Sequence, residues 1–349
     1  MKKIIFLFIC ICASINNSGQ NETAKWYFGA NAALDFMTNP PTVLNNSAMD
    51  KYQGSSTIAD AAGNLLFYTD GNNVWNKQHV IMANGTLPLS MGSNQARAMI
   101  VKQPGNSNLY YIFRFYIAGC YTTFPVPPAT TGFYYSVVDM SMSNGLGSVI
   151  VSNVFIYGVP SNLTSTAQLH ATKHANGVDY WIMIHEHPSN SRAYLFSSGG
   201  INPTAVVSSS TGLSYDCNST GFLKFSPTGQ KLCVSVSYAG VELYNFNNNS
   251  GLVNNPLTLI SNTLEANYFG CAFSADGTKL YAGHNISGST NSNLIQWDIN
   301  AGSAQAIHSS SVNIPSNSFY PQVLQLAPNG KIYIATQNSQ SLRFYPAVI

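Results

Sequence analysis

Charged side chains are scarce in this sequence, at 8% of its 349 residues. The chain carries 15 basic and 13 acidic residues, and removal of Lys2 and Lys3 with the leader described below leaves 13 of each sign. Proteins that bind nucleic acids carry basic patches that displace the counterions of the phosphates. The formally neutral mature chain has no such patch, so we expect no nucleic-acid partner.

Long hydrophobic runs are missing beyond the N-terminus. A membrane helix needs about 20 consecutive apolar residues, and we therefore expect no transmembrane segment. At the N-terminus, Lys2 and Lys3 precede an apolar run over residues 4–13, and small and polar residues continue to Gly19. This order is typical of a cleaved secretory signal. We expect residues 1–19 to be a signal peptide and the mature protein to be secreted or displayed on the outer cell surface.

Cysteine is rare, and its spacing matches no metal-binding motif. Four cysteines remain after the leader: Cys120, Cys217, Cys233 and Cys271. An oxidising compartment permits disulfides, but four cysteines allow three pairings that the sequence cannot separate. Buried or loop thiols are an equal alternative, so the pairing stays open.

Amide, hydroxyl and aromatic residues take the place of charges, with 20 tyrosines and 27 glycines among them. A neutral polar surface with many turns suits an extracellular all-β protein. Neither a Pro-rich nor a Gly/Ser-rich linker divides the chain, so we expect residues 20–349 to form a single domain and the protein to be a monomer.

A hairpin recurs six times along the chain. Each copy is a short apolar strand, a polar turn with glycine, and a second strand rich in aromatic and β-branched residues. The copies cover residues 57–68, 101–112, 173–181, 225–232, 273–281 and 326–333. Pro or Asp ahead of Gly favours a tight reversal, because Gly accepts the positive φ that other residues resist.

The turn glycines are 42, 72, 52, 48 and 53 residues apart, close to the length of a four-stranded propeller blade. Two further strands fit within each interval, and the longest interval holds an insertion. The sequence therefore predicts an all-β fold, a β-propeller of four-stranded blades; a β-sandwich or a solenoid is the alternative. We favour seven blades over six, with residues 26–36 and 42–44 joining residues 342–348 to close the ring.

The segments that carry a family resemblance begin with Trp26-Tyr27-Phe28-Gly29. They continue through residues 63–71, 135–147 and 173–181. In these segments the chain resembles the secreted propeller domains of Bacteroidota adhesin-like and gliding-motility-associated proteins, which are cargo of the type IX secretion system. The hairpins alone also resemble those of WD40 and lactonase-like propellers. The resemblance implies surface display and binding, and it brings no catalytic residues.

Strand direction divides the candidate functional residues between two rims. Because strands alternate within a blade, the links from second to third strand emerge on the rim opposite the glycine hairpins, and we predict the ligand face there. The candidates are Asp70, Asn72, Tyr116, Tyr121, Phe124, His185, His187, Tyr238 and His284. We expect Tyr116, Tyr121 and Phe124 to give a flat platform for sugars or an extended peptide.

No residue pattern amounts to a catalytic or metal site. His170, His185 and His187 invite a three-ligand interpretation, but we favour separate roles for them: one hydrogen-bonds its loop, one lies in a strand that lines the channel, and one is exposed on the rim. The segment from Asp70 to Asn73 resembles the start of a calcium loop without its later ligands, so we predict an Asx-type turn. The sequence contains no Gly-x-Ser-x-Gly elbow. We expect no catalytic residues, no metal and no cofactor.

Two functions follow as hypotheses. The first is a binding or adhesion module without catalytic activity, whose partner is an extracellular glycan or protein. The alternative is a lactonase-like or glycosidase-like hydrolase acting at the mouth of the central channel. A third possibility is a scaffold whose active module lies beyond Ile349.

Overall fold

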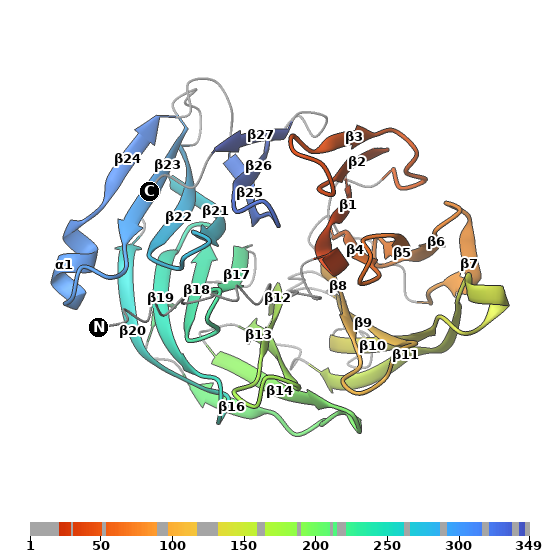
Figure 1. Ribbon diagram of the computed structural model, residues 1–349. Coiled ribbons are helices and arrows are strands. Elements are labelled where there is room, and N and C mark those ends of the chain that lie inside the picture. The colour runs from red at the N-terminus through yellow and green to blue at the C-terminus, as the bar shows by residue number, and fades with distance from the viewer. Residues whose placement is uncertain are drawn as a thin grey trace, which may run out of the picture.

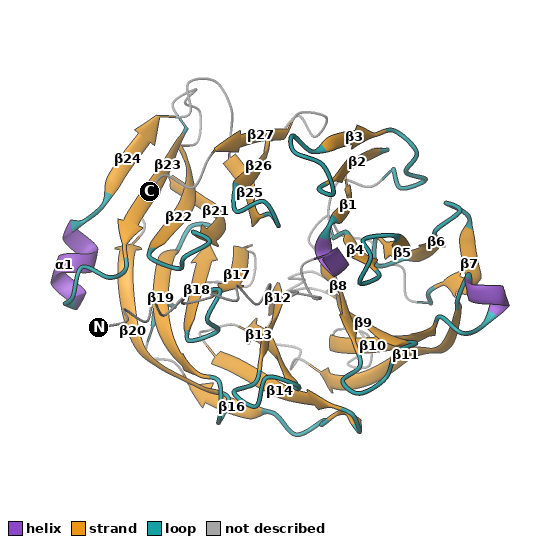
Figure 2. Ribbon diagram, viewed as in Figure 1, coloured by secondary structure: helices purple, strands orange, loops and turns teal. Residues whose placement is uncertain are grey.

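The computed structural model describes residues 21–28, 31–50, 54–88, 97–116, 132–158, 165–186, 190–209, 212–214, 221–261, 266–286, 292–315, 321–336 and 342–345. Strands make up most of them, as predicted (Figure 2). The helical elements are the short segments η1 (Asn21–Thr23), η2 (Ser143–Gly145) and α1 (Ala304–Ser309). Among the described residues, no helix has the length and apolar character that a membrane crossing requires.

The described strands form six sheets, and the eight-stranded sheet divides into two antiparallel groups, so that seven antiparallel groups follow one another along the chain. The first three groups are β1 (Lys25–Phe28), β2 (Ala32–Asp35) and β3 (Thr42–Leu44); β4 (Ser56–Ala59), β5 (Leu65–Thr69), β6 (Asn73–Asn76) and β7 (Ile81–Thr86); and β8 (Arg97–Lys102), β9 (Leu109–Tyr116), β10 (Gly132–Asp139) and β11 (Ser148–Gly158). The next two are β12 (Ser165–Lys173), β13 (Tyr180–Glu186), β14 (Asn190–Ser197), β15 (Gly200–Ile201) and β16 (Val206–Ser209); and β17 (Gly221–Phe225), β18 (Lys231–Val236), β19 (Gly240–Asn247) and β20 (Leu252–Ser261). The last two are β21 (Ala266–Phe273), β22 (Lys279–Ile286), β23 (Asn293–Asp298) and β24 (Val312–Pro315); and β25 (Pro321–Leu326), β26 (Ile332–Thr336) and β27 (Leu342–Tyr345).

The groups are arranged around a common centre, as in a propeller (Figure 1). Neighbouring inner strands pack against each other in chain order: β1 with β4, then β8, β12, β17, β21 and β25. Within each group the strands pair from the inside outward. The second and third groups are also joined at their outer strands by one parallel pairing, Ala83 with Ser148.

All six predicted glycine hairpins form at the link between the first two strands of a group. In the fifth group, for example, Gly229 has a φ of 68°, and its N–H donates to the carbonyl of Ser226 at 2.9 Å. A residue with a Cβ would be strained at this φ. The repeat therefore predicted the positions of these hairpins correctly, because each copy contains the residues of its own turn.

Apolar and aromatic side chains from adjacent groups fill the spaces between sheets. Phe113, Phe133 and Phe196 are fully buried between the third and fourth groups, where the Phe113 and Phe133 rings stack at 5.8 Å. Each such side chain contributes about 1.5–3 kcal/mol through burial. The packing between successive sheets, which share few backbone bonds, thus holds the ring together.

The two chain ends meet, but not in the way that the sequence suggested. We expected residues 342–348 to join the N-terminal strands in one sheet; instead β27 pairs with β26, and β1–β3 form a sheet of their own. The two sheets pack through side chains, with the ring of Tyr333 at 5.7 Å from that of Trp26 and 5.2 Å from that of Phe36. At this junction, packing of aromatic side chains takes the place of backbone hydrogen bonds between the first and last sheets. Because the first and last groups have three described strands each, seven blades stays a prediction.

Candidate functional site

Three of the predicted rim residues, Tyr121, Phe124 and His187, lie outside the described residues, and Tyr116 is described only as the last residue of β9. The others are spread over four groups: Asp70 and Asn72 follow β5, His185 lies near the end of β13, Tyr238 follows β18, and His284 lies near the end of β22. All are at the ends of second strands, away from the glycine hairpins. They belong to separate local clusters rather than to one constellation.

Asp70 caps a turn, as the sequence predicted. Its Oδ1 accepts hydrogen bonds from the backbone N–H groups of Asn72 at 2.8 Å and Asn73 at 2.7 Å. This is the geometry of an Asx turn. The side chain is 5% exposed, so its carboxylate shapes the link between β5 and β6.

Arg114 contacts the loop that follows Asp70, and we did not select it from the sequence. Its guanidinium is buried and donates to the carbonyls of Gly71 and Pro88 and to the side chain of Asn153. Burial lowers the pKa of Arg114 to about 10, and the nearby negative charge of Asp70 opposes that shift. One arginine therefore links the loop of the second group to strands of the third. The sequence did contain a sign of this role, because Arg114 is the one charged residue in β9, whose other residues are aliphatic or aromatic.

His185 lies between the fourth and fifth groups, with no exposed surface. Its Nδ1 is 3.0 Å from Oγ of Ser191, and its ring centroid is 6.5 Å from that of Tyr244. Burial lowers its pKa to about 3. The imidazole is therefore neutral at physiological pH, and it is buried between two sheets rather than exposed on the rim.

Glu242, a buried acid in the fifth group, is another residue that we did not select from the sequence. Its Oε2 accepts from the hydroxyl of Tyr244 at 2.6 Å, and its Oε1 accepts from the backbone N–H of Leu213 at 2.8 Å. Gly212 lies over both side chains, and a Cβ there would collide with the Tyr244 hydroxyl and the Glu242 carboxylate. These bonds tie the segment before β17 to β19 and compensate the cost of burying the carboxylate.

A second buried acid, Glu186, occupies the opposite face of the fourth group. Its Oε1 accepts from Nε of Arg192 at 2.8 Å, and the Arg192 guanidinium lies 4.1 Å from the centroid of the Tyr157 ring. Glu186 is 1% exposed. The charge pair therefore joins the third and fourth groups in the way that Arg114 joins the second and third.

His284 and His170 also have local partners. His284 stacks on Tyr268 with ring centroids 5.0 Å apart, and burial lowers its pKa. His170 pairs with Met183 across β12 and β13, two residues from His185, and packs near Phe225. Within the described part of the chain, no three His, Cys, Asp or Glu side chains are grouped as a metal site would require.

Tyr238 is the most accessible of the predicted rim residues that the structure describes. Its side chain is 57% exposed, and its backbone has a φ of 60°, a conformation that L-residues other than Asn and Asp seldom adopt. The strained turn between β18 and β19 therefore presents an aromatic ring to solvent. This agrees with the predicted position without testing its role.

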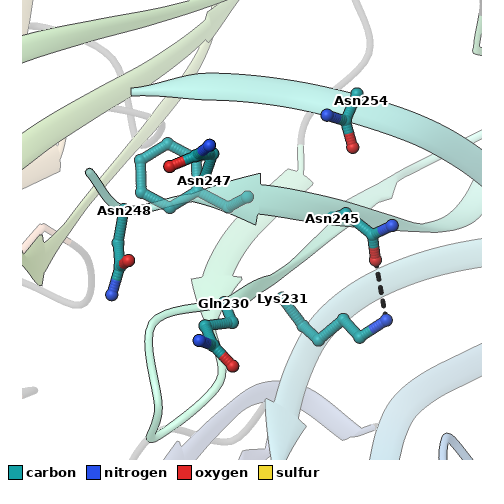
Figure 3. A pocket seen from close by; sticks show the side chains of 7 residues that line it. Gln230, Lys231, Asn245, Asn247, Asn248 and Asn254 are labelled. Carbon is teal, nitrogen blue, oxygen red and sulfur yellow. Dashed lines mark hydrogen bonds between the residues drawn. The ribbon is translucent and has the colours of Figure 1, made fainter. Parts of the chain in front are cut away.

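A hollow of about 470 Å³ lies on the opposite rim, beside the hairpin of the fifth group (Figure 3). We call it the amide hollow. The residues that line it are Gln230, Lys231, Asn245, Phe246, Asn247, Asn248 and Asn254. Its volume is within the range of about 300–1,000 Å³ of small-molecule sites. We did not select these residues from the sequence, although the asparagines at 245 and 247–249 were a visible signal.

Hydrogen bonds fix the walls of the amide hollow. Nζ of Lys231 donates to Oδ1 of Asn245 at 2.7 Å, and Oδ1 of Asn247 accepts from the backbone N–H of Asn249 at 3.0 Å. The carbonyl of Asn248 accepts from Nε1 of Trp181 at 2.8 Å. The turn between β19 and β20 is therefore anchored to the neighbouring fourth group, and the hollow is formed in advance of any ligand.

Comparisons with known proteins give only remote likenesses. No family model and no curated protein matches the chain. Among solved structures, the β-propeller domain of Cps50 (Swd1) from Myceliophteria thermophila is similar at 11% identity and a TM-score of 0.47, over 94% of this chain and 97% of that one. Hydrazine synthase from Kuenenia stuttgartiensis is similar at 13% identity and a TM-score of 0.48, over 91% and 93%. A putative 6-phosphogluconolactonase from Bacteroides uniformis is similar at 11% and 0.38, over 80% and 91%. Likeness this low says nothing about activity, so no ligand or reaction is carried over.

The buried imidazole of His185 predicts a pH-dependent stability. Its pKa is about 3 in the folded state, against the ordinary histidine value of 6.5, so between these pH values the unfolded chain binds a proton that the folded chain does not. The stabilisation is present above pH 6.5 and is lost as the pH falls toward 3. From about pH 7.5 to about pH 5, we expect His185 to contribute a loss of about 2 kcal/mol.

Urea unfolding of the wild type and of His185→Gln at the two pH values measures this contribution. The variant should show a smaller loss of stability on acidification than the wild type. His308→Gln is the matched control, since His308 is exposed, and it should retain the full loss. An equal loss in His185→Gln and the wild type would show that His185 is not buried as described.

Proposed function

We propose that this protein is a binding module without catalytic activity, which recognises an extracellular glycan or a polar protein segment. The observation that carries this proposal is the amide hollow, a preformed concave surface lined by six polar side chains. The proposal differs from our expectation in one respect: the hollow is on the hairpin rim, whereas the sequence favoured the opposite rim.

The chemistry of the hollow suits a hydroxyl-rich or peptide ligand. Each amide offers two donors and one acceptor oxygen, so neighbouring amides can match the alternating donors and acceptors of a sugar or a peptide backbone. Asn245 and Asn254 are direct partners across β19 and β20. Lys231 adds one positive charge, which also accommodates a ligand with a single carboxylate.

The described acidic side chains near the predicted rim are engaged in structural roles, which supports binding over hydrolysis. Asp70 caps a turn, Glu186 pairs with Arg192, and Glu242 holds Tyr244 and Leu213. A hydrolase would use such carboxylates as an acid or a base within reach of a substrate. Their bonds here instead join neighbouring sheets.

The setting outside the cell is part of the proposal. It rests on the predicted signal at residues 1–19 and on the resemblance of Trp26-Tyr27-Phe28-Gly29 and the later segments to secreted Bacteroidota propellers. Fractionation of the source cells, with N-terminal sequencing of the mature protein, tests it. A mature N-terminus at Met1 in a cytoplasmic fraction would contradict it.

Screening the purified chain on a glycan and peptide array tests the binding function. We expect selective binding of a ligand class, and a loss of about 10-fold or more in affinity for the double variant Gln230→Ala, Asn254→Ala, because each lost hydrogen bond costs about 0.5–1.5 kcal/mol. Asn300→Ala, an exposed asparagine on the same rim, is the matched control and should bind as the wild type does.

Variants of the predicted rim show which of the two rims binds the ligand, the hairpin rim with the amide hollow or the rim opposite it. Loss of binding in Tyr121→Ala and Phe124→Ala, with the amide-hollow variant unaffected, would place the ligand on the rim opposite the hairpins. Turnover of a lactone or glycoside by the wild type would overturn the non-catalytic proposal in favour of the hydrolase alternative. Absence of any ligand on the array would contradict the binding module as proposed.

A further inference from the structure

Two cysteines from consecutive sheets lie against each other in the core. Cys233 is in β18, and Cys271 is in the first strand of the next group, β21. Both side chains are fully buried and belong to the same hydrophobic cluster, together with Leu243 and Phe273. The two residues are therefore neighbours in space although 38 positions separate them in the chain.

Their thiols are hydrogen-bonded to each other. The Cys271 sulfur also lies 3.8 Å from the carbonyl oxygen of Phe222, to which it donates. Both sulfurs are thiols in this structure. Burial raises the pKa of the Cys233 thiol well above its ordinary value, and the bond to Cys271 adds to the shift. A thiol in this environment is a poor nucleophile, so the folded interior protects it from reaction.

We infer that Cys233 and Cys271 are a disulfide pair, which forms when the chain folds in the presence of a disulfide oxidant and then links the fifth group to the sixth. Of the three pairings that the sequence left open, this is the one in which Cys233 and Cys271 are partners; Cys120 and Cys217 lie outside the described residues. The link would cross a boundary at which side-chain packing connects the sheets.

The oxidation balances with a small disulfide such as oxidised glutathione. One cysteine thiolate attacks a sulfur of the oxidant and releases one thiolate, which gives a mixed disulfide. The second cysteine attacks its partner in that mixed disulfide and releases the other thiolate. Two electrons pass to the oxidant, and the two cysteine protons end on its two thiols. This sequence takes place before the sheets dock, since neither sulfur is accessible afterwards.

Peptide mapping of the mature chain tests the pairing directly. Trypsin leaves Cys233 and Cys271 in one peptide, residues 232–279, because the sequence has no Lys or Arg between Lys231 and Lys279. Further cleavage after Glu242 and Glu265 separates them into peptides 232–242 and 266–279. After refolding with oxidised glutathione and alkylation of free thiols, we expect these two peptides to be joined and to separate on reduction.

The same peptide map can also overturn the inference. Joining of either peptide to one that holds Cys120 or Cys217 would exclude this pair, and so would full alkylation of Cys233 and Cys271 after the oxidised protein is unfolded without a reductant. Refolding with reduced glutathione is the control and should give separate, alkylated peptides.

A thermal measurement separates the bond from the packing of two thiols. For a chain of this size, a disulfide raises the Tm by roughly 3–6 °C. Cys233→Ala, Cys271→Ala and the double variant should therefore all lose that same increment under oxidising conditions, because either change breaks the bond. Additive losses that also persist under reducing conditions would show that packing, and not a bond, is responsible.

Discussion

Replacing Arg114 by methionine is expected to lower the free energy of unfolding by about 3–5 kcal/mol, since removal of one partner from a buried charge network leaves the others without compensation. The carbonyls of Gly71 and Pro88 would lose a donor, and Asp70 would lose the positive charge nearest to it. Methionine keeps most of the side-chain length, so lost volume does not explain the effect. Urea denaturation measures the change.

An exposed ion pair provides the matched control. Nζ of Lys279 is 2.8 Å from Oδ2 of Asp298, with side chains 23% and 38% exposed, and such pairs contribute about 0–1 kcal/mol. Lys279→Met should therefore be nearly neutral. If Arg114→Met were also nearly neutral, the link between the second and third groups would not depend on the guanidinium.

Replacing Tyr333 by alanine is the second large effect that we expect. Truncation of a buried aromatic side chain costs about 3–5 kcal/mol, and here the loss falls on the junction of the two chain ends. Tyr333 is 7% exposed and contacts the rings of Trp26 and Phe36. We expect the N-terminal sheet, residues 25–44, to lose protection from hydrogen exchange before the rest of the molecule.

The variant Tyr333→Phe separates the contribution of the ring from that of the hydroxyl. Tyr333→Phe keeps the ring and removes only the hydroxyl, which accepts from Nδ2 of Asn329 at 3.0 Å. It should cost about 1 kcal/mol and leave exchange in the N-terminal sheet unchanged. A uniform loss of protection over all sheets in Tyr333→Ala would mean that the first and last sheets are not a distinct closing junction.

The fold could be predicted from the sequence because its information is local. Each hairpin carries its own glycine turn and its own alternating strands, as at residues 225–232, so six copies were visible without any knowledge of their partners. The junction between the first and last sheets was harder to predict from the sequence. Nothing in the sequence near Trp26 or Tyr333 indicates that packing between two sheets, instead of a shared ladder, joins the ends.

The candidate sites depend on contacts between distant segments, and this limits what the sequence can show. The position of His185 at the end of a second strand followed from strand counting, but the ring of Tyr244 that lies beside it belongs to the next sheet, 59 positions away. Arg114, Cys233 and Cys271 gain their roles in the same way. Such pairs become visible only when the ring brings the faces of two sheets together.

We propose the amide hollow as the ligand site of this propeller. A crystal structure of the chain with the strongest ligand from the array is the most direct measurement. We expect the ligand to hydrogen-bond to Asn254, Gln230 or Lys231 beside the hairpin of the fifth group. Ligand density on the opposite rim, near Asp70 and Tyr238, or within the central channel would contradict the claim.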